Sequence, residues 1–313
     1  MILRDRRMHK AMSIVAWSWL TGIIFPLAAL AHDTWLIGVP AVVESGGTVK
    51  LRLFTGETFP LDEQTTDPSR VAEWTVVAQA VAHRVEEYGI DGDTLAATVR
   101  AEHPGVAVAA IALKPRYLEM EGTKFEEYLT DEKAAEALAA RQKSSDGASK
   151  PGREYYTKLA KTYFQVNRPK GAKDTGAEVE AVPLNGFDQP VGHPLEIIPL
   201  TNPFTWGAGD TIAVRVLLKG KPAKGLRVSS GHEQLPKHTF IENVVTDEEG
   251  VARFTLSWVG QMWFLRTHRI EPLDPPARRG GDDAPLADWE SYFASMTFQI
   301  QPRKDKEIAP PKP

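Results

Sequence analysis

The chain has 313 residues, of which 42% are hydrophobic, a formal net charge of −4 at pH 7 and no cysteine. This length and hydrophobic content are sufficient for a sizeable core, and the absence of cysteine excludes disulfides and thiolate metal sites. An acidic balance supplies no clustered basic surface for phosphates, which argues against a nucleic-acid partner.

The first 31 residues have the pattern of an export signal. Four cations and one anion lie in the first ten residues, an uncharged apolar run covers 11–27, and Ala29-Leu30-Ala31 follows. This order is typical of a cleaved secretory signal peptide; an uncleaved anchor is the alternative, although a spanning helix needs about 20 apolar residues. We expect cleavage after Ala31 and a periplasmic or secreted mature chain that starts at His32 with a charge of −7, since the signal removes four cations and one anion.

Alternating patterns predict strands in the next ninety residues. Between 48 and 56, Val49, Leu51 and Leu53 alternate with charged residues, which is typical of a half-buried strand. Further strands are expected at 72–81, around 95–102 and at 106–113. Residues 32–122 are therefore predicted to form an N-terminal β-sandwich unit.

Residues 123–170 are predicted to form a helical insertion. Thr130 is a candidate N-cap, and two acidic residues and an alanine-rich stretch follow it, all of which favour a helix. After a turn-forming linker, Tyr156, Leu159, Ala160 and Tyr163 have the i, i+3, i+4, i+7 spacing of one apolar helix face. We expect two short helices that pack as a hairpin on the sandwich.

The last third returns to strand patterns. Apolar residues alternate from 212 to 216 and again from 292 to 300, with glycine-containing turns at 219–222 and 247–250. Short strands separated by such turns indicate a β-sandwich, so 171–302 is predicted to be a C-terminal unit, and the charged, proline-rich tail at 303–313 is expected to be disordered. The predicted fold class is mainly β, with two Ig-like or transthyretin-like β-sandwich units and a short helical hairpin insertion.

Six stretches of the chain, taken in order, resemble one family. They are "AHDTWL", "KPRYLEMEGTKFEEYL", "GHPLEIIPLTNP", "TDEEGVARFTL", "FLRTHRIE" and "DWESYFASMTFQI", and together they resemble the periplasmic domain-of-unknown-function 4198 family. The resemblance covers nearly the whole mature chain. The family resemblance implies a role as an accessory component of nickel or cobalt uptake, and the final sandwich also resembles the transthyretin-like modules of secreted proteins. Fold alone does not define function, so the chemistry has to come from individual residues.

His32 is the main candidate for a functional residue. The sequence has no HExxH, no Gly-x-Ser-x-Gly and no glycine-rich phosphate loop, so we expect a non-enzymatic protein without a nucleotide partner. If the chain begins at His32, its α-amino group and its imidazole Nδ1 can chelate one divalent ion near neutral pH. A second imidazole would complete a three-nitrogen histidine brace suited to copper, and also to nickel, and Asp33 would add an oxygen or an outer contact. The alternative is that His32 only begins an edge strand.

Three further histidines are candidates for the second imidazole. His268 lies at the end of a predicted strand before a long loop, which is a common place for functional side chains. His103 precedes a Pro-Gly turn beside Glu102, and His193 lies in one of the family-like stretches.

Three functions stay open at this point. The first is a periplasmic metal-binding protein that captures nickel, cobalt or copper for a membrane uptake system. The second is a non-catalytic β-sandwich interaction or carrier module of the cell envelope. The third is a copper-dependent oxidoreductase with a histidine brace.

Overall fold

A computed structural model describes residues 32–61, 63–143, 147–169, 186–236, 239–256 and 262–300. The predicted signal peptide, the predicted tail and residues 170–185 lie outside these ranges. The described residues all belong to one compact unit, which begins at His32. None of the described helices is long and apolar enough to cross a membrane.

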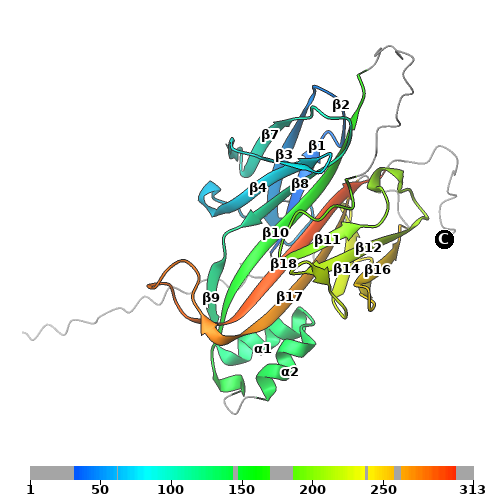
Figure 1. Ribbon diagram of the computed structural model, residues 1–313. Helices are drawn as coiled ribbons and strands as arrows, with labels where there is room; N and C mark the ends of the chain where they lie inside the picture. Colours follow the sequence, from blue (N-terminus) through cyan, green and yellow to red (C-terminus); the bar gives the residue numbers. More distant parts are fainter. Residues whose placement is uncertain are drawn as a thin grey trace, which may run out of the picture. The chain divides into compact units, whose positions relative to one another are not determined.

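The described strands form three sheets (Figure 1). The first sheet has the order β1-β3-β7-β6, with the bounds β1 Asp33–Val39, β3 Thr48–Gly56, β6 Tyr88–Asp91 and β7 Thr94–Arg100. The third sheet has the order β11-β12-β13, with β16 also paired to β12; the bounds are β11 Leu195–Pro199, β12 Thr211–Leu218, β13 Lys221–Pro222 and β16 Val251–Thr255.

The second sheet is the central one and has ten strands in the order β15-β14-β17-β18-β10-β8-β4-β5, with β2 and β9 also paired to β10. Its strands in chain order are β2 Val42–Glu44, β4 Val71–Ala78, β5 Val81–Arg84, β8 Gly105–Leu113, β9 Arg116–Met120, β10 Gly152–Asn167, β14 Arg227–His232, β15 Glu242–Val245, β17 Met262–Ala277 and β18 Ala287–Gln299. Two α-helices and three short 3-10 helices complete the described elements: α1 Gly122–Asp131, α2 Ala135–Gln142, η2 Pro68–Arg70, η3 Gly147–Ser149 and η4 Pro203–Thr205.

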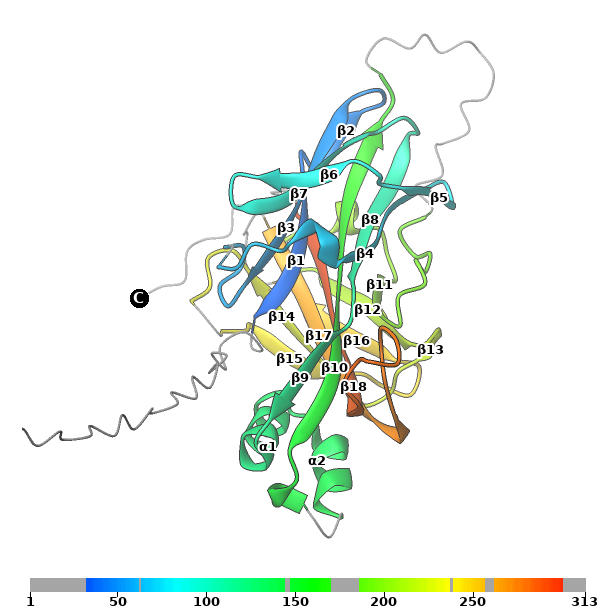
Figure 2. The same ribbon diagram turned by 90° about the vertical axis from the view of Figure 1, so that its left-hand side faces the viewer.

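The middle strands of the central sheet are buried on both faces. On β8, Val106 and Val108 belong to a core shared with the third sheet, whereas Ala107 and Ala109 belong to a core shared with the first sheet. Because successive strand residues point to opposite faces, the first and third sheets cover opposite sides of the second (Figures 1 and 2). The two sandwiches therefore share one sheet, and the predicted mainly β class with β-sandwich units and a helical hairpin is confirmed.

The predicted second helix at 153–166 is wrong, because this stretch is β10. Leu159 and Tyr163 contact one core, and Ala160 and Phe164 contact the other. Both faces of β10 are largely buried and each carries apolar residues among polar ones, so residues chosen from both of its faces can imitate helical spacing. The strand runs parallel to β18, with Leu159 paired to Ala294, and this pairing joins the middle of the chain to its end.

The helical hairpin is present, but it lies earlier than predicted. Both of its helices, α1 and α2, fall between β9 and β10, within residues 122–142. Thr130 lies in the last turn of α1, where its hydroxyl donates to the Glu126 carbonyl, so it is not an N-cap. The predicted strand at 72–81 is divided because Gln79 and Ala80 adopt positive φ values of 50° and 62° and turn the chain from β4 into β5.

Candidate functional site

His32 lies beside two carboxylates at one end of the first sheet. The antiparallel register pairs Asp33 with Gly56, so the preceding and following residues, His32 and Glu57, lie opposite each other. His32 Nε2 is 3.5 Å from Glu57 Oε1 and 3.7 Å from Glu63 Oε2. The ligand atoms of the three side chains all lie within 4.8 Å of one another. We refer to this group as the His32 cluster.

The backbone fixes Glu63 in this position. Beyond β3 the chain folds back, and the backbone N–H of Glu63 donates to the carbonyl of Thr55 at 2.9 Å. The side chains of His32, Glu57 and Glu63 are 13%, 11% and 29% exposed. A ligand can therefore reach the cluster from solvent at Glu63, while His32 and Glu57 lie largely in the protein.

Two buried cations contact His32 and its neighbour Asp33. Lys158 on β10 donates its Nζ to the His32 carbonyl at 2.6 Å, and Arg266 on β17 forms an ion pair with Asp33 at 2.8 Å. Burial lowers the pKa of Lys158 to about 8, while the Asp33 carboxylate opposes this shift. Burial raises the pKa of Asp33 against the opposing charge of Arg266. Asp33 thus pairs with a guanidinium and does not join the ligand atoms of the cluster.

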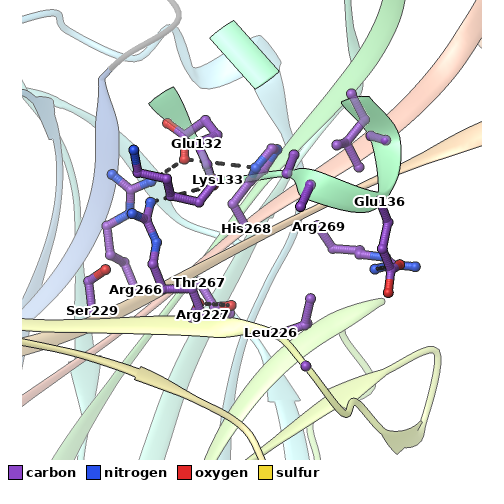
Figure 3. A pocket seen from close by; sticks show the side chains of 15 residues that line it. Glu132, Lys133, Glu136, Leu226, Arg227, Ser229, Arg266, Thr267, His268 and Arg269 are labelled. Atoms are coloured by element: carbon purple, nitrogen blue, oxygen red, sulfur yellow. Dashed lines mark hydrogen bonds and ion pairs between the residues drawn. The ribbon is translucent and has the colours of Figure 1, made fainter. Parts of the chain in front are cut away.

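His268 lies in a buried polar network that lines a cavity of about 90 Å³ (Figure 3). Its side chain is 3% exposed and stacks on Phe293 with ring centroids 4.2 Å apart. Nε2 is 3.2 Å from the Tyr128 hydroxyl, and Nδ1 is 3.8 Å from Glu132 Oε2. Glu132 also accepts from Arg266 at 2.6 Å.

This environment disfavours a bound cation at His268. Burial, followed by the charges of Arg266, Arg227 and Arg269, holds the pKa of His268 well below its ordinary value. A neutral imidazole surrounded by guanidiniums can accept or donate hydrogen bonds, but a metal ion placed beside it would be repelled by the same charges. His268 is connected to Asp33 only indirectly, through Glu132 and Arg266.

His193 is also buried and lies just before β11. Burial, with a further contribution from Lys161, lowers its pKa to about 4. The nearby Lys161 and Glu196 form a buried ion pair at 2.9 Å, and Glu196 accepts two backbone N–H groups. His193 therefore borders a structural ion pair that has its own partners.

His103 is exposed in the turn between β7 and β8, where its ring faces that of His83. Among the described residues, the group of three or more histidine or carboxylate ligands is His32, Glu57 and Glu63. The structure therefore brings none of His103, His193 and His268 into one ligand group with His32. Sequence reasoning missed Glu57 and Glu63; the signal for Glu57 was its position one residue after a predicted strand.

Fold and site together define a three-layer β protein with a histidine–carboxylate cluster at one end of its first sheet. The chain belongs to the family described as domain of unknown function (DUF4198), whose model matches residues 29–270. This confirms the family resemblance of the sequence. No curated protein matches the chain.

Solved structures show distant likeness only. The adhesin InvE of Yersinia pseudotuberculosis is 10% identical with a TM-score of 0.22, over 84% of this chain and 58% of that one. The D0-D1 domain of intimin is 12% identical with a TM-score of 0.20, over 85% and 97%. A Salmonella alpha-2-macroglobulin mutant is 10% identical with a TM-score of 0.23, over 90% and 16%. The chain thus spans less than two thirds of the adhesin and of the macroglobulin.

Proposed function

We propose that this protein is an exported metal-binding protein, accessory to the uptake of nickel or cobalt, that holds a divalent ion at the His32 cluster. The observation that carries this proposal is the convergence of one imidazole and two carboxylates within 4.8 Å. Cleavage after Ala31 would add the α-amino group of His32 to the same site.

The donor set favours some metals over others. An imidazole with two carboxylates is a mixed nitrogen and oxygen set; imidazole suits nickel, copper and zinc, whereas carboxylates suit harder ions. A copper brace requires a second imidazole, and the described residues offer none in one ligand group with His32. The proposed cargo is nickel or cobalt, as the family resemblance implies. Because affinity at one nitrogen and oxygen site rises from cobalt through nickel to copper, copper is included in the titration below. The oxidoreductase alternative, which needs a histidine brace, gains no support from the described geometry.

The hydrogen bond from Lys158 and the ion pair of Asp33 support the same proposal. They fix the carbonyl of His32 and the side chain of the next residue, so the imidazole is presented to Glu57 and Glu63 by a rigid backbone. Ordering the ligands before the ion arrives reduces the conformational cost of binding. The partner implied by this function is a membrane uptake system that receives the ion.

The test is a titration of chains that differ only at the cluster. Intact mass of exported protein establishes whether its first residue is His32, and calorimetry with Ni(II), Co(II) and Cu(II) then measures affinity. H32A, E57Q and E63Q should each weaken Ni(II) binding at this site by about tenfold or more, because loss of even an outer-shell partner costs 10–100-fold. E73Q, an exposed glutamate on β4, is the matched control. Unchanged Ni(II) affinity in both H32A and E57Q would refute the proposal.

One added residue before His32 separates the two contributions to the site. If the α-amino group is a ligand, this extension should weaken binding while leaving the imidazole and the carboxylates in place. An extension that leaves affinity unchanged would show that the cluster binds through its side chains alone.

A further inference from the structure

Two exposed histidines lie close together at the far edge of the central sheet. His83 lies on the edge strand β5, paired across to Val76 of β4, and His103 lies in the turn that leads into β8. Their ring centroids are 6.4 Å apart and their planes differ by 26°. Gln79, in the turn before β5, donates its side-chain amide to the Pro104 carbonyl at 3.4 Å, so the two segments that carry the histidines are tied together.

Both rings line one cavity of about 440 Å³. The same cavity is lined by the carboxylates of Glu86, Glu87 and Glu102 and by the guanidiniums of Arg84 and Arg100. With neutral imidazoles these charged groups sum to −1, and Arg100 is already paired with Glu102 at 3.7 Å. The net negative charge of the residues that line the cavity therefore favours a bound cation.

The distance between the rings fits one ion held by both. Metal–nitrogen bonds of about 2.0–2.1 Å place the centroids of two imidazoles on the same ion about 4.5 Å apart at a right angle and about 6.4 Å apart when the rings lie on opposite sides of the ion. The observed 6.4 Å lies at the upper end of this range, and a smaller angle at the metal requires a change of about 1–2 Å, which exposed side chains make by rotamer changes.

We propose that His83 and His103 form a second metal site, which binds a borderline divalent ion (Ni(II), Zn(II) or Cu(II)) through their two imidazoles. Imidazole suits these ions, whereas Mg(II) and Ca(II) prefer an all-oxygen set. Glu102, Glu86 and Glu87 line the same cavity, but none of them forms a group of three ligands with the two imidazoles in the described residues, so water would supply the remaining ligands. Because both rings are open to solvent, the site would exchange its ion freely.

This site is independent of the His32 cluster and is tested in its absence. In an H32A chain, titration with NiCl2, ZnCl2 or CuCl2 should still show one bound ion. Adding H83A or H103A should weaken that binding by about tenfold or more, and the double change should abolish it. Copper loaded onto the H32A chain should show two nitrogen couplings in its EPR spectrum.

The H32A chain is also the matched control for the H83A and H103A changes, because it lacks one histidine that lies outside this cavity and keeps both histidines inside it. If H32A alone removes all binding, the second site is refuted and the proposed function stands. If H32A keeps one ion and H83A then releases it, the second site stands whatever the His32 cluster does. Unchanged affinity in the H32A/H83A/H103A chain, compared with H32A, refutes the second site. Circular dichroism checks that the variants fold, as expected for exposed side chains.

Discussion

Glu154 offers the sharpest test of the buried network around His268. This carboxyl is 0% exposed, and its Oε1 accepts from Ser291 and, at 3.3 Å, from Tyr128. No cation is among the groups that shift its pKa; burial raises that pKa from 4.5 to about 7, and Glu132 adds to the shift. Replacement by glutamine keeps an acceptor oxygen for both hydroxyls and removes the ionisation.

The expected effect depends on pH in a defined direction. Native Glu154 holds its proton more tightly than the unfolded chain does, so the free energy of unfolding falls as pH rises from 4.5 to about 7 and this contribution is then constant. At about 1.4 kcal/mol per pKa unit, the loss amounts to about 3 kcal/mol. E154Q should lack this loss, so its stability relative to the unmodified chain should increase by about 3 kcal/mol between pH 4.5 and pH 8.

Urea denaturation followed by tryptophan fluorescence, at intervals from pH 4.5 to 8, measures this difference. E73Q, on an exposed position of β4, controls for the loss of one carboxylate. A stability difference between E154Q and the unmodified chain that stays constant across the range would refute the argument. It would mean that Glu154 is ionised in the native protein at the same pH as in the unfolded one.

Two further predictions concern packing and charge in the core. K161M removes the partner of Glu196 from an ion pair whose side chains are 2% and 1% exposed, so the free energy of unfolding measured in urea should fall by about 3 kcal/mol. K161M/E196Q should recover more than half of this loss, because it also removes the unpaired charge. A decrease of less than about 1 kcal/mol in K161M would contradict this reasoning. In G152A the new Cβ would overlap the ring of the fully buried Phe125, so the free energy of unfolding should decrease by about 1–3 kcal/mol and the melting temperature should fall. An unchanged melting temperature would show that β10 or α1 moves freely at this contact.

The sequence by itself determined the β character of the protein and several of its strands. Alternation of Val49, Leu51 and Leu53 corresponds to β3, and these three residues are fully buried. The run from 106 to 113 corresponds to β8, and the C-terminal alternation to β18. β3 could be predicted because a strand with one solvated face shows its period of two in the residue types. β8 could be predicted as a short, continuous apolar run, which is typical of a strand buried on both faces.

Of the three residues of the His32 cluster, only His32 was predicted from the sequence. His32 stood out through its position behind an Ala-x-Ala triplet, but its neighbours Glu57 and Glu63 depend on the register between β1 and β3 and on the loop that returns to Thr55. The same holds for His83 and His103, which are twenty residues apart in sequence and meet across a sheet edge.

Tertiary structure alone decided β10 and the state of His268. β10 lies between two covering sheets, so the apolar residues of its two faces combine into a spacing that a helix can also produce. His268 carries no mark in sequence that distinguishes an exposed ligand from a buried, neutral ring. The difference arises from Phe293, Tyr128 and the arginines around it, since desolvation and neighbouring charge are set by what packs against a residue and not by the residue's own position in the chain.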